Sequence, residues 1–219
     1  MFQAVLFDLD GVITETSEYH YQAWKMLASG LGIKLNRAVN EQLKGVSRED
    51  SLKIILRYGG RENDFSESEF QALAAKKNNY YVESIQNVSP KDLFPGIAAL
   101  LEELQTHQIK IALASASKNG SFLIERLGIK DYFDAIADPS QVEHGKPAPD
   151  IFLAAASKIG VSPDKCIGVE DAAAGIAAIK AAGMLPVGVG SPNVLGEDIA
   201  IVTTTAALTF NYLKKVWSE

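Results

Sequence analysis

The sequence predicts an α/β protein: a parallel-sheet core domain with a helical domain inserted into it. Short apolar runs alternate with longer segments of helical periodicity through much of the chain, which is typical of βαβ units. About a hundred residues separate the first two of these runs, far more than a single crossover helix needs. An inserted domain is the simplest explanation of that length.

The apolar runs predict the strands of the core. Their ranges are residues 4–7, 109–114, 135–137, 166–169 and 186–189. A helix is predicted over 97–106, after two prolines that make a stiff joint. The apolar stretch 172–190 is interrupted by Lys180, Pro186 and several glycines, so it predicts a helix followed by a strand rather than a membrane span.

The insert has its own helix signals. Ser66 and Glu69 form a capping-box pattern ahead of an apolar run, and Ser47 with Asp50 forms a weaker one. The apolar stripe of the first helix consists of Tyr19, Ala23, Leu27 and Leu31. That helix is expected to end near Gly30 or Gly32. These pieces predict a cap of four helices.

The joints between the two domains follow from the same signals. We expect a core domain over residues 1–14 and 95–219, a cap over 15–94, and hinges near 14–16 and 89–95. The two connections could therefore act together when the cap moves.

Composition excludes several classes of protein. The chain has 21 basic and 27 acidic residues, a formal charge of -6 and no basic block, so nucleic acid is not an expected partner. Cys166 is the only cysteine, which excludes an internal disulfide and suits a reducing compartment; we expect it to be a small buried residue. The first residues lack the basic region of a signal peptide. We expect a cytoplasmic protein without membrane contact.

Two acidic pairs follow predicted strands. Asp8 and Asp10 come directly after the first strand, and Glu170 and Asp171 come after the strand over 166–169. Because ligands gather at the carboxyl ends of parallel strands, we expect the four carboxylates to converge at one sheet edge. Their repulsion calls for a cation, and an all-oxygen shell favours a hard metal such as Mg²⁺. The simpler alternative for the second pair is a solvated loop or a helix cap.

Two lysines and several small hydroxyl residues predict a phosphate site. Ser115, Ser117 and Lys118 lie between the second strand and a helix N-terminus, where backbone amides attract anions. Lys146 stands in a loop held by two prolines, ahead of another helix. The alternatives are an ordinary N-cap by Ser117 beside a solvated lysine, and a cap by Asp150 beside an exposed Lys146.

The motifs DLDG at 8–11, a serine after the second core strand, KPAPD at 146–150 and GVED at 168–171 resemble the haloacid dehalogenase (HAD) superfamily of aspartate-nucleophile phosphotransferases. The resemblance implies a Rossmann-like core in which Asp8 attacks phosphorus and Asp10 is the general acid and base. The Mg²⁺ ligands that it implies are Asp8, Asp10 through its backbone carbonyl, Glu170 and Asp171. Ser115, Ala116 and Lys146 would hold the phosphoryl group being transferred.

The chain resembles the sugar phosphomutases of this superfamily, through the first cap helix, the stretch 43–51, the run 76–78 and the stretch 114–119. The likeness covers essentially the whole chain. The residues that it implies for the substrate and the second phosphate are Thr16, His20, Trp24, Lys44, Gly45, Val46, Arg48, Ser51, Lys77, Ser117, Lys118 and Asn119. It implies an isomerase that interconverts β-D-glucose 1-phosphate and glucose 6-phosphate, with β-glucose 1,6-bisphosphate as intermediate and activator.

Simpler interpretations of the cap residues stay open. His20 could be a partly buried polar residue, and Trp24 could be a packing residue. Lys76 and Lys77 could form the solvent-facing side of the last cap helix, and Arg48 could be a surface arginine.

Position 15 departs from the family pattern, because Glu15 stands where aspartate is usual between two threonines. The added methylene lies at the predicted hinge, so we expect it to bear on cap closure and not on the chemistry at Asp8. We also expect a cis peptide bond before Pro147, since such bonds mark tight functional turns.

Two rival functions are compatible with the core motifs. A sugar-phosphate phosphatase on the same scaffold would give the phosphoryl group to water. A non-catalytic sugar-phosphate-binding domain would keep only the fold. The expected partners are small sugar phosphates, and the expected state is a monomer.

Overall fold

The computed structural model describes residues 1–218, which form two compact units. The sheet unit consists of Met1–Glu15 and Val88–Glu219, and the helical unit consists of Thr16–Asn87. The return connection over 88–96 therefore belongs to the sheet unit, whereas the sequence places the corresponding boundary at 94/95. None of the described helices is long and apolar enough to span a membrane.

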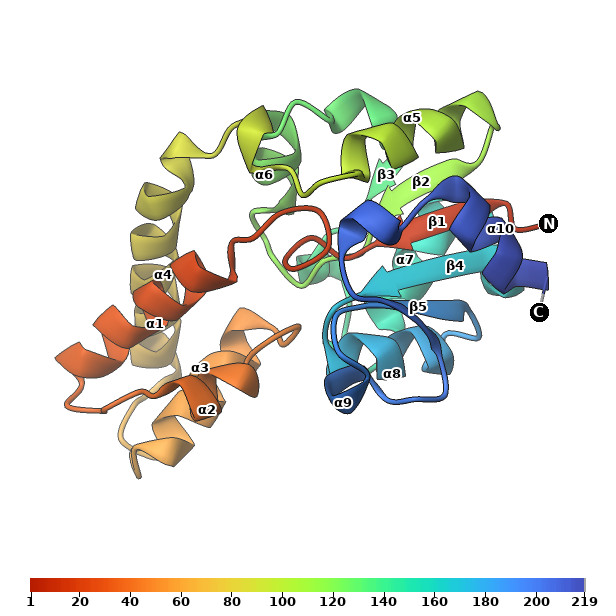
Figure 1. Ribbon diagram of the computed structural model, residues 1–219. Helices are drawn as coiled ribbons and strands as arrows, with labels where there is room; N and C mark the ends of the chain where they lie inside the picture. Colours follow the sequence, from red (N-terminus) through yellow and green to blue (C-terminus); the bar gives the residue numbers. More distant parts are fainter. Residues whose placement is uncertain (219) are drawn as a thin grey trace. The chain divides into compact units, whose positions relative to one another are not determined.

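The sheet unit contains a six-stranded sheet in the order β3-β2-β1-β4-β5-β6, in which every pairing is parallel (Figure 1). The strands are β1 (Ala4–Phe7), β2 (Lys110–Leu113), β3 (Ala135–Ile136), β4 (Cys166–Glu170), β5 (Leu185–Val189) and β6 (Ala200–Val202). The predicted α/β fold class is confirmed. The five predicted strands are present, with ends shifted by at most one residue.

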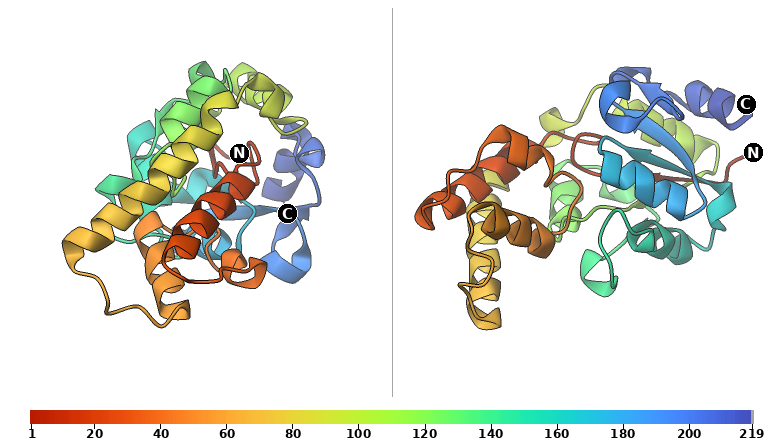
Figure 2. Two further views of the ribbon diagram at one scale, coloured as in Figure 1. Left: turned by 90° about the vertical axis from the view of Figure 1, so that its left-hand side faces the viewer. Right: turned by 90° about the horizontal axis from the view of Figure 1, so that it is seen from below.

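The helices of the sheet unit cover both faces of the sheet. They are α5 (Ile97–Thr106), α6 (Gly120–Arg126), α7 (Asp150–Ile159), α8 (Ala173–Ala181), α9 (Pro192–Leu195) and α10 (Phe210–Ser218). The side chains of Ala4 and Leu6 pack with α7 and α8 in one buried cluster. Figure 1 shows α5 on the opposite side of the sheet from α8, and the right view of Figure 2 shows α8 in front of the strands.

Register places the ends of three strands side by side. Phe7 lies opposite Leu113 of β2 and Val169 of β4. All four residues of β1 are buried, as expected for a central parallel strand with neighbours on both sides and helices on both faces. The polar residues that follow β1, β2 and β4 therefore emerge at one edge of the sheet.

The helical unit has four α-helices, as the sequence predicts. They are α1 (Ser17–Gly30), α2 (Arg37–Glu41), α3 (Arg48–Tyr58) and α4 (Glu67–Ser84), and a 3-10 turn over Ile85–Asn87 follows. The capping box of Ser66 and Glu69 starts α4, and the Ser47 hydroxyl accepts a hydrogen bond from the Asp50 amide at the start of α3. Both helix starts agree with the sequence signals.

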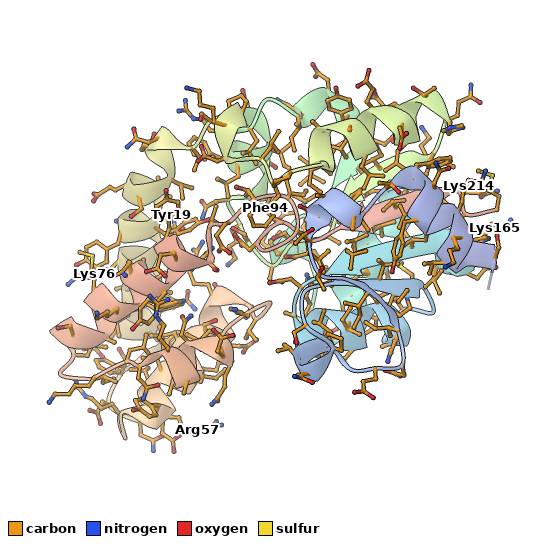
Figure 3. The ribbon with its side chains drawn as sticks, viewed as in Figure 1. Tyr19, Arg57, Lys76, Phe94, Lys165 and Lys214 are labelled. Carbon is orange, nitrogen blue, oxygen red and sulfur yellow. The ribbon has the colours of Figure 1, made fainter. Side chains whose placement is uncertain are left out.

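The predicted apolar stripe of α1 is wrong at one position. Tyr19 is 38% exposed, whereas Tyr21, Trp24 and Leu27 are buried against the other helices of the unit. The buried face of α1 is therefore rotated away from Tyr19, because α4 lies beside α1 and covers a different side (Figure 2). Figure 3 shows Tyr19 at the surface of this helix.

The two connections are tied to each other within the sheet unit. Buried Thr14 donates a hydrogen bond from Oγ1 to the carbonyl of Asp92 over 2.7 Å, and Phe94 donates its amide to the carbonyl of Ile13 over 2.9 Å. Thr14 also contacts the turn before it, because its carbonyl accepts a hydrogen bond from the amide of Gly11 over 2.9 Å. The turn that carries Asp10 and Gly11 is thus linked to both connections.

Candidate active site

Three carboxylates meet at the edge of the sheet where β1 and β4 end. Ligand oxygens of Asp8, Glu170 and Asp171 all lie within 4.8 Å of one another. Asp8 is buried, and its amide donates to the carbonyl of Val169 over 3.0 Å. Three of the four carboxylates expected at this edge are thus brought together, and the carboxylate of Asp10 is not among those within 4.8 Å. Asp10 lies farther along the same turn, in a bridge to Thr14.

Lys146 joins two of these acids. Its Nζ lies 2.6 Å from Asp8 Oδ1 and 2.6 Å from Glu170 Oε1, and the side chain is buried. The alternative of an exposed lysine beside a cap by Asp150 is wrong. The Lys146-Pro147 peptide bond is cis, as predicted.

Glu170 is held at both carboxylate oxygens. Oε1 accepts from Lys146, while Oε2 accepts from the backbone amides of Asp171 and Ala172, each over 2.9 Å. The residue is 0% exposed and lies directly before α8, whose N-terminus favours a negative charge. The alternative of a solvated loop is therefore wrong for Glu170.

The pKa values of this buried pair depend on opposing effects. Burial acts to lower the pKa of Lys146, but the charges of Asp8 and Glu170 outweigh it and hold the pKa above its ordinary value. Burial raises the pKa of Glu170, and the neighbouring charge of Asp8 adds to this effect, while Lys146 opposes it. Asp8 and Glu170 thus share the single ammonium group of Lys146.

Gly11 allows a close approach beside Asp171. The residue has a φ of 77°, and a Cβ added there would lie 2.1 Å from Asp171 Oδ2. A side chain at this position would both strain the backbone and displace the carboxylate. The closeness of Asp171 therefore explains on steric grounds why the DLDG motif has a glycine at this position.

The residues after β2 form a turn with internal hydrogen bonds. The hydroxyl of buried Ser115 accepts from the amide of Ser117 over 3.1 Å, and the hydroxyl of Ser117 accepts from the amide of Asn119 over 3.3 Å. The N-cap residue of α6 is Asn119, so the alternative in which Ser117 is that cap is wrong. Ala116 is half-buried and Lys118 is exposed.

A buried lysine and three aromatic rings lie between α1 and α4 of the helical unit. Lys77 Nζ is 2.6 Å from His20 Nδ1 and 4.7 Å from the centroid of the Trp24 ring. The Tyr81 ring stacks on His20 with centroids 3.8 Å apart, and its hydroxyl lies 3.1 Å from Thr16 Oγ1. Tyr81 is absent from the sequence-predicted site.

Adjacent lysines on α4 have opposite environments. Lys77 is 2% exposed, whereas Lys76 projects from the outer side of the helix (Figure 3). The interpretation of both residues as a solvent-facing pair is therefore wrong for Lys77. Trp24 is buried in the core of the unit, so its packing role is confirmed.

The remaining candidates of the helical unit lie on or just before α3. Arg48 donates from Nη2 to Asn78 Oδ1 over 2.8 Å, and burial lowers its pKa from the ordinary value. Ser51 is buried, and Lys44 forms a 2.9 Å ion pair with Glu41. Gly45 has a φ of 71° in the turn before α3, and Val46 follows it half-buried. Asn78 is not among the residues that the sequence predicts for the site, although it lies in the 76–78 run.

A model of the haloacid dehalogenase-like hydrolase family matches residues 2–183. The chain belongs to the haloacid dehalogenase-like family. Its sheet order and its acidic cluster with Lys146 are thus those of a haloacid dehalogenase-like protein, as the motifs predict.

Relatives within this family extend the comparison. The chain is 49% identical to a β-phosphoglucomutase of Bacillus subtilis over 218 residues, which are 99% of this chain and 96% of that protein. It is 28% identical to a phosphorylated carbohydrates phosphatase of Thermotoga maritima, over 83% of this chain and 82% of that one. A crystal structure of a β-phosphoglucomutase from Clostridium difficile matches with a TM-score of 0.98 and 46% identity, covering 100% of this chain and 98% of that one.

The donor set of this haloacid dehalogenase-like protein fits a hard divalent cation. Asp8, Glu170 and Asp171 present only oxygen atoms within a small space, which is the chemistry that Mg²⁺ prefers. Two of these acids, Asp8 and Glu170, share the ammonium group of Lys146. No described residue adds sulfur or imidazole to this group, so the site does not resemble one for zinc.

The environment of His20 predicts a histidine that stays neutral. Desolvation, and then the charges of Lys77 and Arg48, hold its pKa well below 6.5. We expect the His20 ring resonances in an NMR titration not to shift as the pH falls through about 6.5, the ordinary pKa of histidine. The unfolded chain does take up this proton, so the free energy of unfolding should decrease below that pH. A His20→Gln variant assigns the resonance and should flatten the slope. A His20 midpoint near the ordinary value would contradict the prediction.

Proposed function

We propose that this protein is a β-phosphoglucomutase, an isomerase that interconverts β-D-glucose 1-phosphate and glucose 6-phosphate through β-glucose 1,6-bisphosphate. The observation that carries the proposal is the extent of the likeness to the Bacillus subtilis enzyme, which spans 99% of this chain and therefore includes both units. A likeness confined to the sheet unit would support only a phosphotransferase. Core motifs alone do not distinguish a mutase from a phosphatase.

Asp8 is the nucleophile in this proposal. Its carboxylate attacks the phosphorus of the bisphosphate, the bond from phosphorus to the sugar oxygen breaks, and an aspartyl phosphate forms. Asp10 gives a proton to the departing sugar oxygen. In the reverse half, a hydroxyl of the sugar monophosphate loses its proton to Asp10 and attacks the aspartyl phosphate, so that the phosphoryl group changes position.

Asp8, Glu170 and Asp171 would hold Mg²⁺, with the backbone carbonyl of Asp10 as a further ligand. When bound, the ion supplies positive charge to the phosphoryl oxygens. The carboxylate group within 4.8 Å supports this assignment. Lys146 keeps Asp8 oriented through its 2.6 Å contact and offers an ammonium to the same phosphoryl group.

The phosphate contacts are proposed for both units. Ser115 and Ala116 would bind the transferring phosphoryl group together with Lys146, since they follow β2 at the edge where Asp8 follows β1. Arg48 of the helical unit would grip the second phosphate, as a guanidinium fork matches phosphate oxygens. The other residues proposed for the second phosphate and the sugar are Thr16, His20, Trp24, Lys44, Gly45, Val46, Ser51, Lys77, Ser117, Lys118 and Asn119.

The helical unit would act as a cap whose closure excludes water. The proposed cap spans residues 15–94, with hinges near 14–16 and 89–95. The hydrogen bonds among Thr14, Asp92 and Gly11 support a connection between cap movement and the turn that carries Asp10. A monomeric state and a cytoplasmic location stay predictions.

A product assay tests the proposal. With Mg²⁺, β-D-glucose 1-phosphate and a trace of β-glucose 1,6-bisphosphate, we expect glucose 6-phosphate as the main product. The α anomer is the matched control substrate, and omission of the bisphosphate should slow the onset of the reaction. Glucose 6-phosphate and inorganic phosphate are measured in the same samples. Inorganic phosphate as the main product would replace the mutase with a phosphatase.

A further inference from the structure

The backbone conformation at position 175 does not require a glycine, although Gly175 stands there. It is the third residue of α8 (Ala173–Ala181), is buried, and has no positive φ. Glycine inside a helix is less favourable than alanine by about 1 kcal/mol. Most of its neighbours in this helix are alanines, so local helix propensity would favour alanine at this position as well.

The space beside Gly175 is filled by Glu170. A Cβ added at Gly175 would lie 1.9 Å from Cδ and 1.9 Å from Oε1 of Glu170, and 2.5 Å from its Cγ. Helical Cα–Cβ bonds tilt toward the N-terminus of the helix, and Glu170 lies just before that end of α8. The carboxylate therefore occupies the volume that any side chain at this position would take.

The side chain of Glu170 cannot move out of that volume without losing contacts. It is 0% exposed, and both oxygens accept hydrogen bonds, from Lys146 Nζ and from the amides of Asp171 and Ala172. Moving the carboxylate would break these bonds and separate it from the only ammonium in contact with it among the described residues. Glu170 can therefore occupy its observed position only because residue 175 has no side chain.

We propose that Gly175 is a positioning residue for the metal-binding carboxylate of Glu170. The inference rests on the proposed function, in which Glu170 shares Mg²⁺ with Asp8 and Asp171. Gly175 has no side chain with which to contact the substrate or the reacting atoms. It acts by leaving room for Glu170 between the helix and Lys146.

The first experiment measures metal binding without substrate. Mn²⁺, another oxygen-preferring ion, is titrated into each variant and the free ion is followed by electron paramagnetic resonance. Gly175→Ala should weaken Mn²⁺ binding at least tenfold, close to the effect of Glu170→Ala. Gly30→Ala is the matched control, because Gly30 is the last residue of α1 and nothing lies within 4 Å of an added Cβ. Mn²⁺ binding by Gly175→Ala within twofold of the unmodified protein would overturn the inference.

The second experiment is a stability cycle with Glu170→Ala. Gly175→Ala should lower the unfolding midpoint of the unmodified protein, because the added methyl group meets Glu170. In the Glu170→Ala background the same change should raise the midpoint, since the space is then free and alanine favours the helix. Equal effects in both backgrounds would overturn the proposal. If Gly175→Ala alone does not fold, recovery of folding in the double variant supports it, and failure of both overturns it.

These readouts are independent of the proposed reaction. The unmodified protein could bind Mn²⁺ and give the predicted cycle while releasing phosphate instead of glucose 6-phosphate. That combination would refute the mutase and leave the role of Gly175 intact. Conversely, a confirmed mutase whose Gly175→Ala variant binds Mn²⁺ normally would refute only the positioning role.

Discussion

Replacing Asp8 with alanine is expected to lower kcat by at least about 10⁴-fold, because the carboxylate that attacks phosphorus is then missing. No described neighbour replaces it: Glu170 is held by Lys146 and two backbone amides, and Asp10 is proposed to handle the proton. The measurement is the initial rate of glucose 6-phosphate formation from β-D-glucose 1-phosphate with Mg²⁺ and the bisphosphate.

The Asp8→Ala variant should stay folded. Lys146 keeps its contact with Glu170, and removal of Asp8 relieves the repulsion between two buried carboxylates. Circular dichroism and the thermal midpoint check this. Appreciable mutase activity in the folded variant would refute Asp8 as nucleophile.

Replacing Lys146 with methionine is expected to destabilise the metal-free protein by about 3–5 kcal/mol, because two buried carboxylates lose their shared cation. Nζ of Lys146 lies 2.6 Å from an oxygen of Asp8 and 2.6 Å from an oxygen of Glu170. Loss of this charge should also lower kcat by about 10²–10³-fold, since the transferring phosphoryl group loses one source of positive charge. Urea unfolding without Mg²⁺ measures the first effect and the product assay measures the second.

Lys165→Met is the matched control for this variant. Lys165 is exposed at the surface of the sheet unit (Figure 3), and surface changes of this kind alter stability by about 0.5 kcal/mol or less. Equal stability of the two variants would show that Lys146 does not neutralise the buried acids. A normal kcat in Lys146→Met would remove it from the catalytic assignment.

Local sequence signals predicted much of the fold because they reflect local physics. The run over residues 4–7 is apolar throughout because β1 is central and covered on both faces. The Ser66 capping box marks the start of α4 through hydrogen bonds within one turn of chain. By contrast, the sequence did not predict β6 (Ala200–Val202), because three residues at a sheet edge are too few to show a hydrophobic period that distinguishes a strand from a loop.

The misjudged positions depend on neighbours far away in the sequence. Tyr19 fits an apolar stripe on α1, but packing against α4 determines which side of the helix is buried. Lys76 and Lys77 are equivalent in the sequence, and contacts with His20 and Trp24 of α1 make one of them a buried residue. Helical periodicity does not contain that information.

The sequence by itself determined the family, the order of the elements and the residue types at the ends of β1, β2 and β4, because motif spacing and hydrophobic pattern are properties of the chain. The tertiary structure alone decided that Lys146 lies between Asp8 and Glu170, that the Asp10 carboxylate stands outside the acidic group, and that Gly175 leaves room for Glu170. These contacts join residues that strand register and helix packing bring together, and they act over a few ångströms. Their geometry therefore exists only once the sheet has formed.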